Sequence, residues 1–175
     1  MFDHRGMNIR QIANFVIRPT LTYIGQDMPG FASDAAVELL LGTMAHESRF
    51  EFVDQITGPN DTKLGPAIGF YQIEPATCRD IFETYLNASS RRGLCDRVLS
   101  LLAARPAMDE QLAGNLNFAT AIARLKYWRS PEQLASPGDI AGHARVWKRV
   151  YNTVNGAGRE ADFINAYQRL VAPNL

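Results

Sequence analysis

The sequence predicts a mainly α fold in which a helical bundle carries one small extended lobe. The chain has 175 residues, of which 46% are hydrophobic and 21% are charged, as expected for one ordinary globular domain. Apolar residues recur with helical spacing along most of the chain, whereas residues 50–73 are rich in helix-breaking glycine and proline. We therefore expect a single domain over residues 1–175, large enough to bury its own core.

Apolar spacing and end signals indicate the first two helices. The first begins near Ile9 and is expected to stop around Arg18, because Pro19 disfavours helical geometry in the residue before it. A second helix is expected from its N-cap Ser33 to about Ser48. Its buried stripe is predicted to consist of four apolar residues at helical spacing: Val37, Leu40, Leu41 and Met44.

Residues 50–73 interrupt the helical pattern. Two Gly-Pro pairs and a further glycine, Gly69, cannot sit within a long helix, so we expect a small irregular hairpin or a few short strands. Helices are expected to resume after Pro75, a favourable first-turn residue. Four further helices are predicted near residues 93–104, 108–129, 139–151 and 159–171.

Composition argues against several classes of protein. Lys+Arg 18 balance Asp+Glu 18, which argues against a nucleic-acid binder that works by broad phosphate neutralisation. No apolar stretch approaches the ~20 residues of a membrane-spanning helix. Cys78 and Cys95 are too few for a disulfide scaffold, and we expect two unpaired thiols. Residues 1–10 lack the apolar core of a secretory signal, so we expect none and expect synthesis in the cytoplasm.

The candidate catalytic residue is Glu47, near the end of the second predicted helix. On a helical projection it lies only about 20° from Leu40, and Met44 lies on the same side. Burial on this apolar stripe disfavours the charged carboxylate and raises its pKa, as a general acid at neutral pH requires. Two alternatives stay open: the helix frays and exposes Glu47, or a cation such as Arg49 pairs with it.

A second candidate segment is residues 65–77. Its glycines permit backbone conformations closed to other residues, Phe70 and Tyr71 offer aromatic faces suited to sugar rings, and Gln72 supplies both a donor and an acceptor. Taken alone, this segment is more typical of a turn before a helix.

Taken together, residues 45–50 and 67–77 resemble the Glu-Ser…Gly-Ala-x-Gly-Leu-x-Gln-x-x-Pro-x-Thr signature of lytic transglycosylases and goose-type lysozymes. Residues 117–125 are similar to the later Asn-x-x-x-Gly/Ala-x-x-Tyr-Leu helix of that family. Tyr151-Asn152 is similar to its Tyr-Asn element, which closes the cleft.

The resemblance covers a motif-bearing core of about residues 34–155 and implies a lysozyme-like α+β architecture with a cleft between bundle and lobe. It implies that Glu47 is the acid/base and that the substrate is the peptidoglycan glycan strand, with no cofactor. Ser48 is expected either to orient the substrate or to cap the helix. The other implied glycan contacts are Tyr71, Gln72, Tyr151 and Asn152.

The resemblance further implies a reaction with a single glutamate, lytic transglycosylation, which leaves a 1,6-anhydro end on N-acetylmuramic acid. Two alternatives stay open. A hydrolytic muramidase needs a second carboxylate, and the extended lobe offers Glu51, Asp54, Asp61 and Glu74, each more typical of a solvated loop charge. The other alternative is a structural protein of a bacteriophage virion whose catalytic activity is vestigial and whose partners are phage particle proteins. A phage particle, the periplasm and the cell wall are the expected locations.

The remaining histidines and aromatic residues give weaker indications of function. His46-Glu47 begins a zinc-binding motif whose second histidine would stand at Phe50, and His4, His46 and His143 are scattered, so we expect no metal site. Trp147 is expected in the core, whereas Tyr151 is expected at the substrate.

Overall fold

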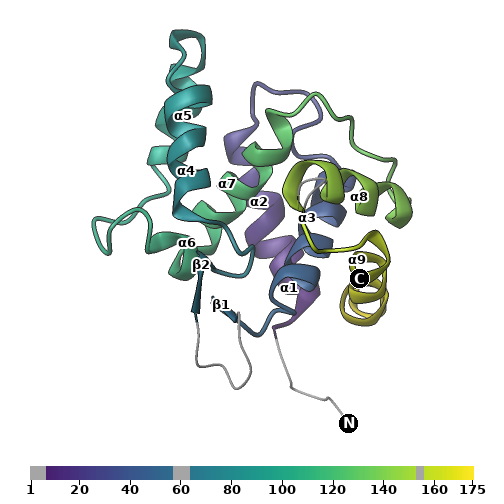
Figure 1. The fold of residues 1–175 in the computed structure, drawn as a ribbon. Coiled ribbons are helices and arrows are strands. Elements are labelled where there is room, and N and C mark those ends of the chain that lie inside the picture. The colour runs from purple at the N-terminus through teal and green to yellow at the C-terminus, as the bar shows by residue number, and fades with distance from the viewer. Residues whose placement is uncertain (1–6, 57–63, 153–155) are drawn as a thin grey trace.

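The computed structural model describes residues 7–56, 64–152 and 156–175, and it confirms a mainly helical fold with a small two-stranded sheet (Figure 1). The α-helices are α1 Ile9–Ile12, α2 Arg18–Ile24, α3 Asp34–Glu47, α4 Pro75–Asp80, α5 Arg92–Leu99, α6 Gln111–Gly114, α7 Leu116–Trp128, α8 Ile140–Val146 and α9 Glu160–Ala166. Shorter π- and 3-10-helical segments extend or follow them: η1 Ala13–Ile17, η3 Ile81–Leu86, η4 Ser89–Arg91, η5 Trp147–Asn152, η6 Tyr167–Val171 and η7 Ala172–Asn174.

The first helix does not stop at Arg18, so that prediction is wrong. α1, η1 and α2 follow one another without a break, and Pro19 lies in the first turn of α2. The wider π-helical turn of η1 precedes the proline, with the Arg18 N–H donating to the Ala13 carbonyl. A widened turn relieves the clash between a proline ring and the preceding turn, and it leaves no ordinary hydrogen bond for the missing N–H to make.

α3 is the central helix, and it matches the expected segment closely. Ser33 is its N-cap, and its side chain accepts a hydrogen bond from the Ala36 N–H at 3.3 Å. All four residues of the predicted stripe are buried, but so are residues on the other faces, among them Leu39, Gly42 and Thr43. α3 is therefore buried almost all round, which a single apolar stripe does not describe.

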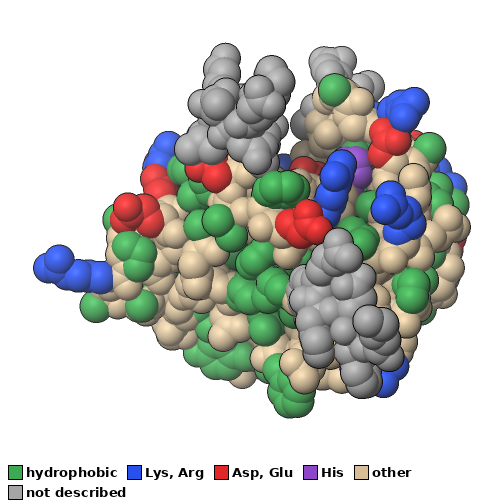
Figure 2. All heavy atoms as spheres, turned by 90° about the horizontal axis from the view of Figure 1, so that it is seen from below, with side chains coloured by type: hydrophobic (Ala, Val, Ile, Leu, Met, Phe, Trp, Pro, Cys, Tyr) green, Lys and Arg blue, Asp and Glu red, His purple; other side chains and the backbone are tan. Residues whose placement is uncertain are grey.

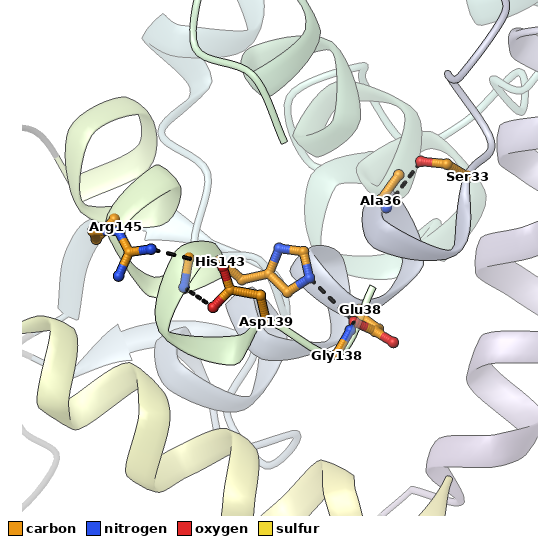
Figure 3. A network of polar contacts seen from close by, with 8 residues as sticks. Ser33, Ala36, Glu38, Gly138, Asp139, His143 and Arg145 are labelled. Atoms are coloured by element: carbon orange, nitrogen blue, oxygen red, sulfur yellow. Dashed lines mark hydrogen bonds and ion pairs between the residues drawn. The ribbon is translucent and has the colours of Figure 1, made fainter. Parts of the chain in front are cut away.

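The other helices cover α3 on several sides. In Figure 1, α7 lies to its left and α8 and α9 to its right, and all three contact it. Figure 3 shows one polar tie between these layers: Glu38 of α3 accepts a hydrogen bond from the Gly138 N–H at 2.7 Å and lies 3.1 Å from Nε2 of His143 in α8. Burial lowers the pKa of His143, so the neutral imidazole is favoured and donates from Nε2.

The extended lobe is a two-stranded antiparallel sheet, as the breaker-rich segment predicts. β1 (Asp54–Ile56) pairs with β2 (Leu64–Ile68) through the partners Asp54 and Ile68, with an irregularity in the register. Asp61 lies outside the described residues.

Two later helices differ from their predicted bounds. The segment expected at 108–129 is divided at Asn115, whose extended backbone separates α6 from α7 and whose side chain accepts from the Phe118 N–H at 3.1 Å. The Asn115 amide also donates to the Leu101 carbonyl at 2.8 Å. This tertiary contact fixes asparagine as an N-cap, a position it favours over the interior of a helix. The helix expected at 93–104 ends earlier, at Leu99.

Cys78 and Cys95 are both free, which agrees with the expectation of unpaired thiols. Among the described residues, no helix combines the length and the apolar character that crossing a membrane demands.

Close packing of α3 against α9 predicts that Gly42→Ala destabilises the protein. A Cβ at residue 42 would lie 2.3 Å from Cζ of Phe163, so we expect a loss of about 1–3 kcal/mol in the free energy of unfolding, measured by urea denaturation. The control is Gly93→Ala in α5, where the Cβ meets only the end of the Arg97 side chain at 3.7 Å. That variant should gain about 0.5–1 kcal/mol from helix propensity. Equal changes in the two variants would contradict the packing.

Candidate active site

Glu47 is the last residue of α3, where the buried helix ends. Its side chain is half-buried, and no cation forms an ion pair with it among the residues that the structure describes. Arg49 does not pair with it and is exposed. The placement of Glu47 therefore agrees with neither alternative for this residue, a frayed helix end in solvent or an ion pair with Arg49.

The turn after Glu47 is held by Ser48. The buried Ser48 hydroxyl donates to the Met44 carbonyl at 3.1 Å and accepts from the Phe50 N–H at 3.2 Å. Arg49 and Phe50 have φ of 55° and 59°, a left-handed conformation that is unfavourable for residues other than glycine. Ser48 therefore caps the helix, one of its two expected roles, and it is only 1% exposed.

Trp147 is the direct partner of the Glu47 carboxylate. Its indole Nε1–H donates to Oε1 of Glu47 at 2.9 Å, and its ring lies 4.2 Å from the ring of His46 and 5.5 Å from that of Phe163, centre to centre. Trp147 is fully buried, so the expectation that it belongs to the core is confirmed. Because its position is fixed by packing, it also fixes one oxygen of Glu47.

Burial raises the pKa of the Glu47 carboxyl from an ordinary 4.5 to about 7. Removal from water is the largest cause, because it disfavours the charged form. The Trp147 hydrogen bond and the positive charge of Lys126 act in the opposite direction and limit the rise in pKa. At neutral pH the carboxyl is thus divided between its acid and base forms, the state that general acid–base chemistry needs.

Lys126 of α7 is the second charged group of this region. Its ammonium donates to the Tyr151 carbonyl at 2.9 Å and lies 3.8 Å from the centre of the Tyr151 ring. Burial lowers its pKa to about 8, and the negative charges of Glu47 and Glu74 oppose that change. Lys126 therefore lies within the electrostatic reach of both carboxylates.

Two of the predicted glycan contacts, Tyr71 and Tyr151, are buried. The Tyr71 hydroxyl is hydrogen-bonded to Thr120 at 3.1 Å, and the Tyr151 hydroxyl donates to the Tyr71 carbonyl at 2.8 Å. The Tyr151 ring stacks on that of Tyr127, with 5.2 Å between the ring centres, and the Lys126 ammonium lies over the Tyr151 ring. The structure thus gives both tyrosines a structural role: they tie the segment after β2 to η5.

Gln72 and Asn152 are half-buried and so keep some exposed surface. Gln72 has φ of 48° and turns its amide back to donate to the Gly69 carbonyl at 2.8 Å. Asn152 accepts a hydrogen bond from Lys148 at 2.9 Å. At Gly69, φ is +77° and a Cβ would lie 2.0 Å from the Leu112 carbonyl oxygen, so this glycine serves a close approach of backbone to α6.

A polar hollow of about 400 Å³ adjoins the end of α3. His46 and Arg49 line it from one side, whereas Glu47 and the predicted glycan contacts are not among the residues that line it. Asp162 and Arg169 line it from α9 and η6. Figure 2 shows the molecule from below relative to Figure 1. Acidic and basic side chains lie beside a histidine in the upper right of that view.

Sequence reasoning missed two residues of the site, Trp147 as a partner of Glu47 and Lys126 as its neighbouring charge. Lys126 carries a usable signal, because it is one of two charged residues, with Arg124, in the largely apolar run of residues 118–128. Trp147 carries none, since 100 residues separate it from Glu47 in the chain.

Comparison with known proteins finds no match for this chain among protein-family models, curated proteins or solved structures. The argument on function therefore depends on the residues and their geometry.

The raised pKa of Glu47 predicts a pH-dependent loss of stability. The folded protein binds this proton more tightly than the unfolded chain, so stability falls as the pH rises from about 4.5 to about 7. The penalty reaches about 3 kcal/mol above pH 7. Glu47→Gln should abolish it, so the variant should gain about that much relative to wild type between pH 4 and pH 8, measured by urea unfolding.

The matched control is Glu51→Gln, an exposed carboxylate four residues later. As a surface substitution, it should change the free energy of unfolding by less than about 0.5 kcal/mol at pH 7. A stability difference between Glu47→Gln and wild type that is independent of pH would contradict the burial of the Glu47 carboxyl.

Proposed function

We propose that this protein is a peptidoglycan-cleaving lytic transglycosylase with Glu47 as its single acid/base. The observation that carries the proposal is a half-buried carboxyl with a pKa near neutrality, held by Trp147 at the end of the central helix. The resemblance of residues 45–50 and 67–77 to the lytic transglycosylase signature supports the choice of substrate. The glycosidic bond cleaved is that between N-acetylmuramic acid and N-acetylglucosamine. A lysozyme-like cleft between the bundle and the two-stranded lobe is part of this proposal.

In the first step, protonated Glu47 donates its proton to the glycosidic oxygen, and the bond between that oxygen and the anomeric carbon breaks. The muramoyl residue is left with an oxocarbenium-like centre. In the second step, the Glu47 carboxylate removes the proton from the C6 hydroxyl of the same sugar, whose oxygen attacks the anomeric carbon. Glu47 regains its proton, and the product carries a 1,6-anhydro end without the entry of water.

The two neighbours of Glu47 suit this cycle. Trp147 occupies Oε1 in both protonation states, so the proton is exchanged through Oε2. Lys126 stabilises the carboxylate form that the second step needs, and because its charge is buried, its effect on Glu47 is stronger than in water. Among the predicted glycan contacts, Gln72 and Asn152 are half-buried and retain surface for the sugar. The proposed place of action is the cell wall, reached from a bacteriophage particle or from the periplasm.

Glu47→Gln should reduce the cleavage of purified cell walls by about 10²–10⁴-fold, the range for loss of a general acid–base group. The measurement is turbidity clearing or zymography at pH 6–7. Glu83→Gln, which removes an exposed carboxylate of η3, should retain wild-type activity. Equal clearing by wild type and Glu47→Gln would remove Glu47 from its role, and no clearing by the wild type would favour a structural protein of a virion.

Hydrolysis by a muramidase is the second candidate function, and one observation favours it. Glu74, exposed at the N-cap of α4, lies close enough to Lys126 to raise the pKa of that lysine, as Glu47 also does. A second carboxylate in this position offers a group to direct a water molecule at the anomeric carbon.

Analysis of the glycan ends separates the two functions. Transglycosylation predicts 1,6-anhydro ends only, detected by mass spectrometry as a product 18 Da lighter than the reducing sugar, a difference of about one water. It also predicts that Glu74→Gln leaves the product unchanged. Reducing ends that are lost in Glu74→Gln would instead establish the hydrolase.

A further inference from the structure

A second hollow, of about 480 Å³, lies at the opposite end of α3 from Glu47. It is formed by the start of α3, the last turn of α7 and the segment that follows α7. Ser33, the N-cap of α3, lines it, whereas Glu47 is the last residue of the same 14-residue helix. At 1.5 Å per residue, about 20 Å of helix separates this hollow from the candidate active site. All the residues that line it are among those that the structure describes.

The distinctive group of this hollow is the buried guanidinium of Arg124, for which the described residues provide no counter-ion. The residue is only 1% exposed, yet no carboxylate lies within ion-pair distance of it among the described residues. Its Nε–H donates to the Phe31 carbonyl at 2.9 Å. The terminal nitrogens, which carry the other four N–H donors, have no acceptor in the described part of the chain.

Aromatic rings hold the guanidinium in place. Its central carbon lies 4.8 Å from the centre of the Phe31 ring and 5.0 Å from that of Trp128, and the two rings pack edge to face at 5.1 Å. Ring faces attract a cation but accept no strong hydrogen bond. Arg124 is therefore positioned firmly, while most of its hydrogen-bonding capacity is unused.

The other charges around the hollow are already paired. Glu132, which also lines it, is 3.2 Å from Arg149. Asp34, in the first turn of α3, is 2.6 Å from Arg18. The N-terminus of α3 adds a positive partial charge on the same side. The unbalanced charge of the hollow is thus positive, and burying it without a partner is unfavourable.

We propose that this hollow binds a small organic oxyanion, a carboxylate or a phosphate ester, through the two terminal nitrogens of Arg124. A planar guanidinium fork matches the paired oxygens of both groups. Trp128 provides an apolar wall for the body of the ligand, and a volume of about 480 Å³ suits a small molecule. The site is distinct from Glu47, and it does not depend on the function proposed for that residue.

The test is a titration of the full chain with benzoate and, separately, with inorganic phosphate, followed by ¹⁵N NMR of backbone amides and arginine Nε–Hε groups. Saturable shifts are expected at Arg124 and at the amides of residues 33–36, with a dissociation constant on the order of 1 mM. Binding of benzoate alone identifies a carboxylate ligand, and binding of phosphate alone identifies a phosphate ester. No saturable shift with either ion, or shifts centred on exposed arginines elsewhere, would overturn the proposal.

Two variants sharpen the result. Arg124→Met replaces an unpaired buried charge by an apolar chain of similar length, so it is expected to fold and to weaken binding by about tenfold or more. Arg92→Gln removes an exposed arginine of α5 and should leave binding unchanged. Undiminished binding by Arg124→Met contradicts the site. If that variant does not fold, the location of the shifts in the wild-type protein decides.

Discussion

The hydrogen bond from the Trp147 indole to Glu47 is the interaction on which the candidate active site depends. It joins the end of α3 to η5 across 100 residues of sequence, at a distance of 2.9 Å. α3 is buried on nearly every face, so its last side chain is placed in a region of low polarity, and a carboxylate there is unfavourable. The fixed N–H of Trp147 provides one partner for the charged form and thereby limits the rise in the pKa of Glu47.

The tyrosines behind this pair show how the same region is kept rigid. Tyr71, Tyr127 and Tyr151 are buried, and each hydroxyl has a hydrogen-bond partner: Thr120, Thr43 and the carbonyl of Tyr71. Buried hydroxyls with partners stabilise one arrangement of the surrounding chain, because any other arrangement leaves them unsatisfied. The segment around β2, the central helix and η5 are in this way locked to one another, and the position of Glu47 is determined by all three.

The two ends of α3 illustrate two responses to a buried charge. Glu47 can respond by binding a proton, since its pKa lies near the ambient pH. Arg124 cannot respond in this way, because burial lowers the pKa of its guanidinium only to about 10, so it stays charged at neutral pH. This difference in chemistry is the basis of the two proposals, proton transfer by Glu47 at one end of the helix and anion binding by Arg124 at the other.

The sequence by itself determined the helical class, the position of α3 with its Ser33 cap and the small hairpin, and it pointed to Glu47 as the candidate acid/base. Each of these depends on local signals: apolar periodicity, capping side chains and helix breakers. Tertiary structure decided the rest. Pro19 was accommodated by a π-helical turn, Asn115 was made a cap by its contact with Leu101, and Tyr71 and Tyr151 were buried with their hydroxyls hydrogen-bonded within the protein. Trp147, Lys126 and Arg124 acquired their roles only when distant segments packed together, because burial and partner distance have no signature in a single stretch of sequence.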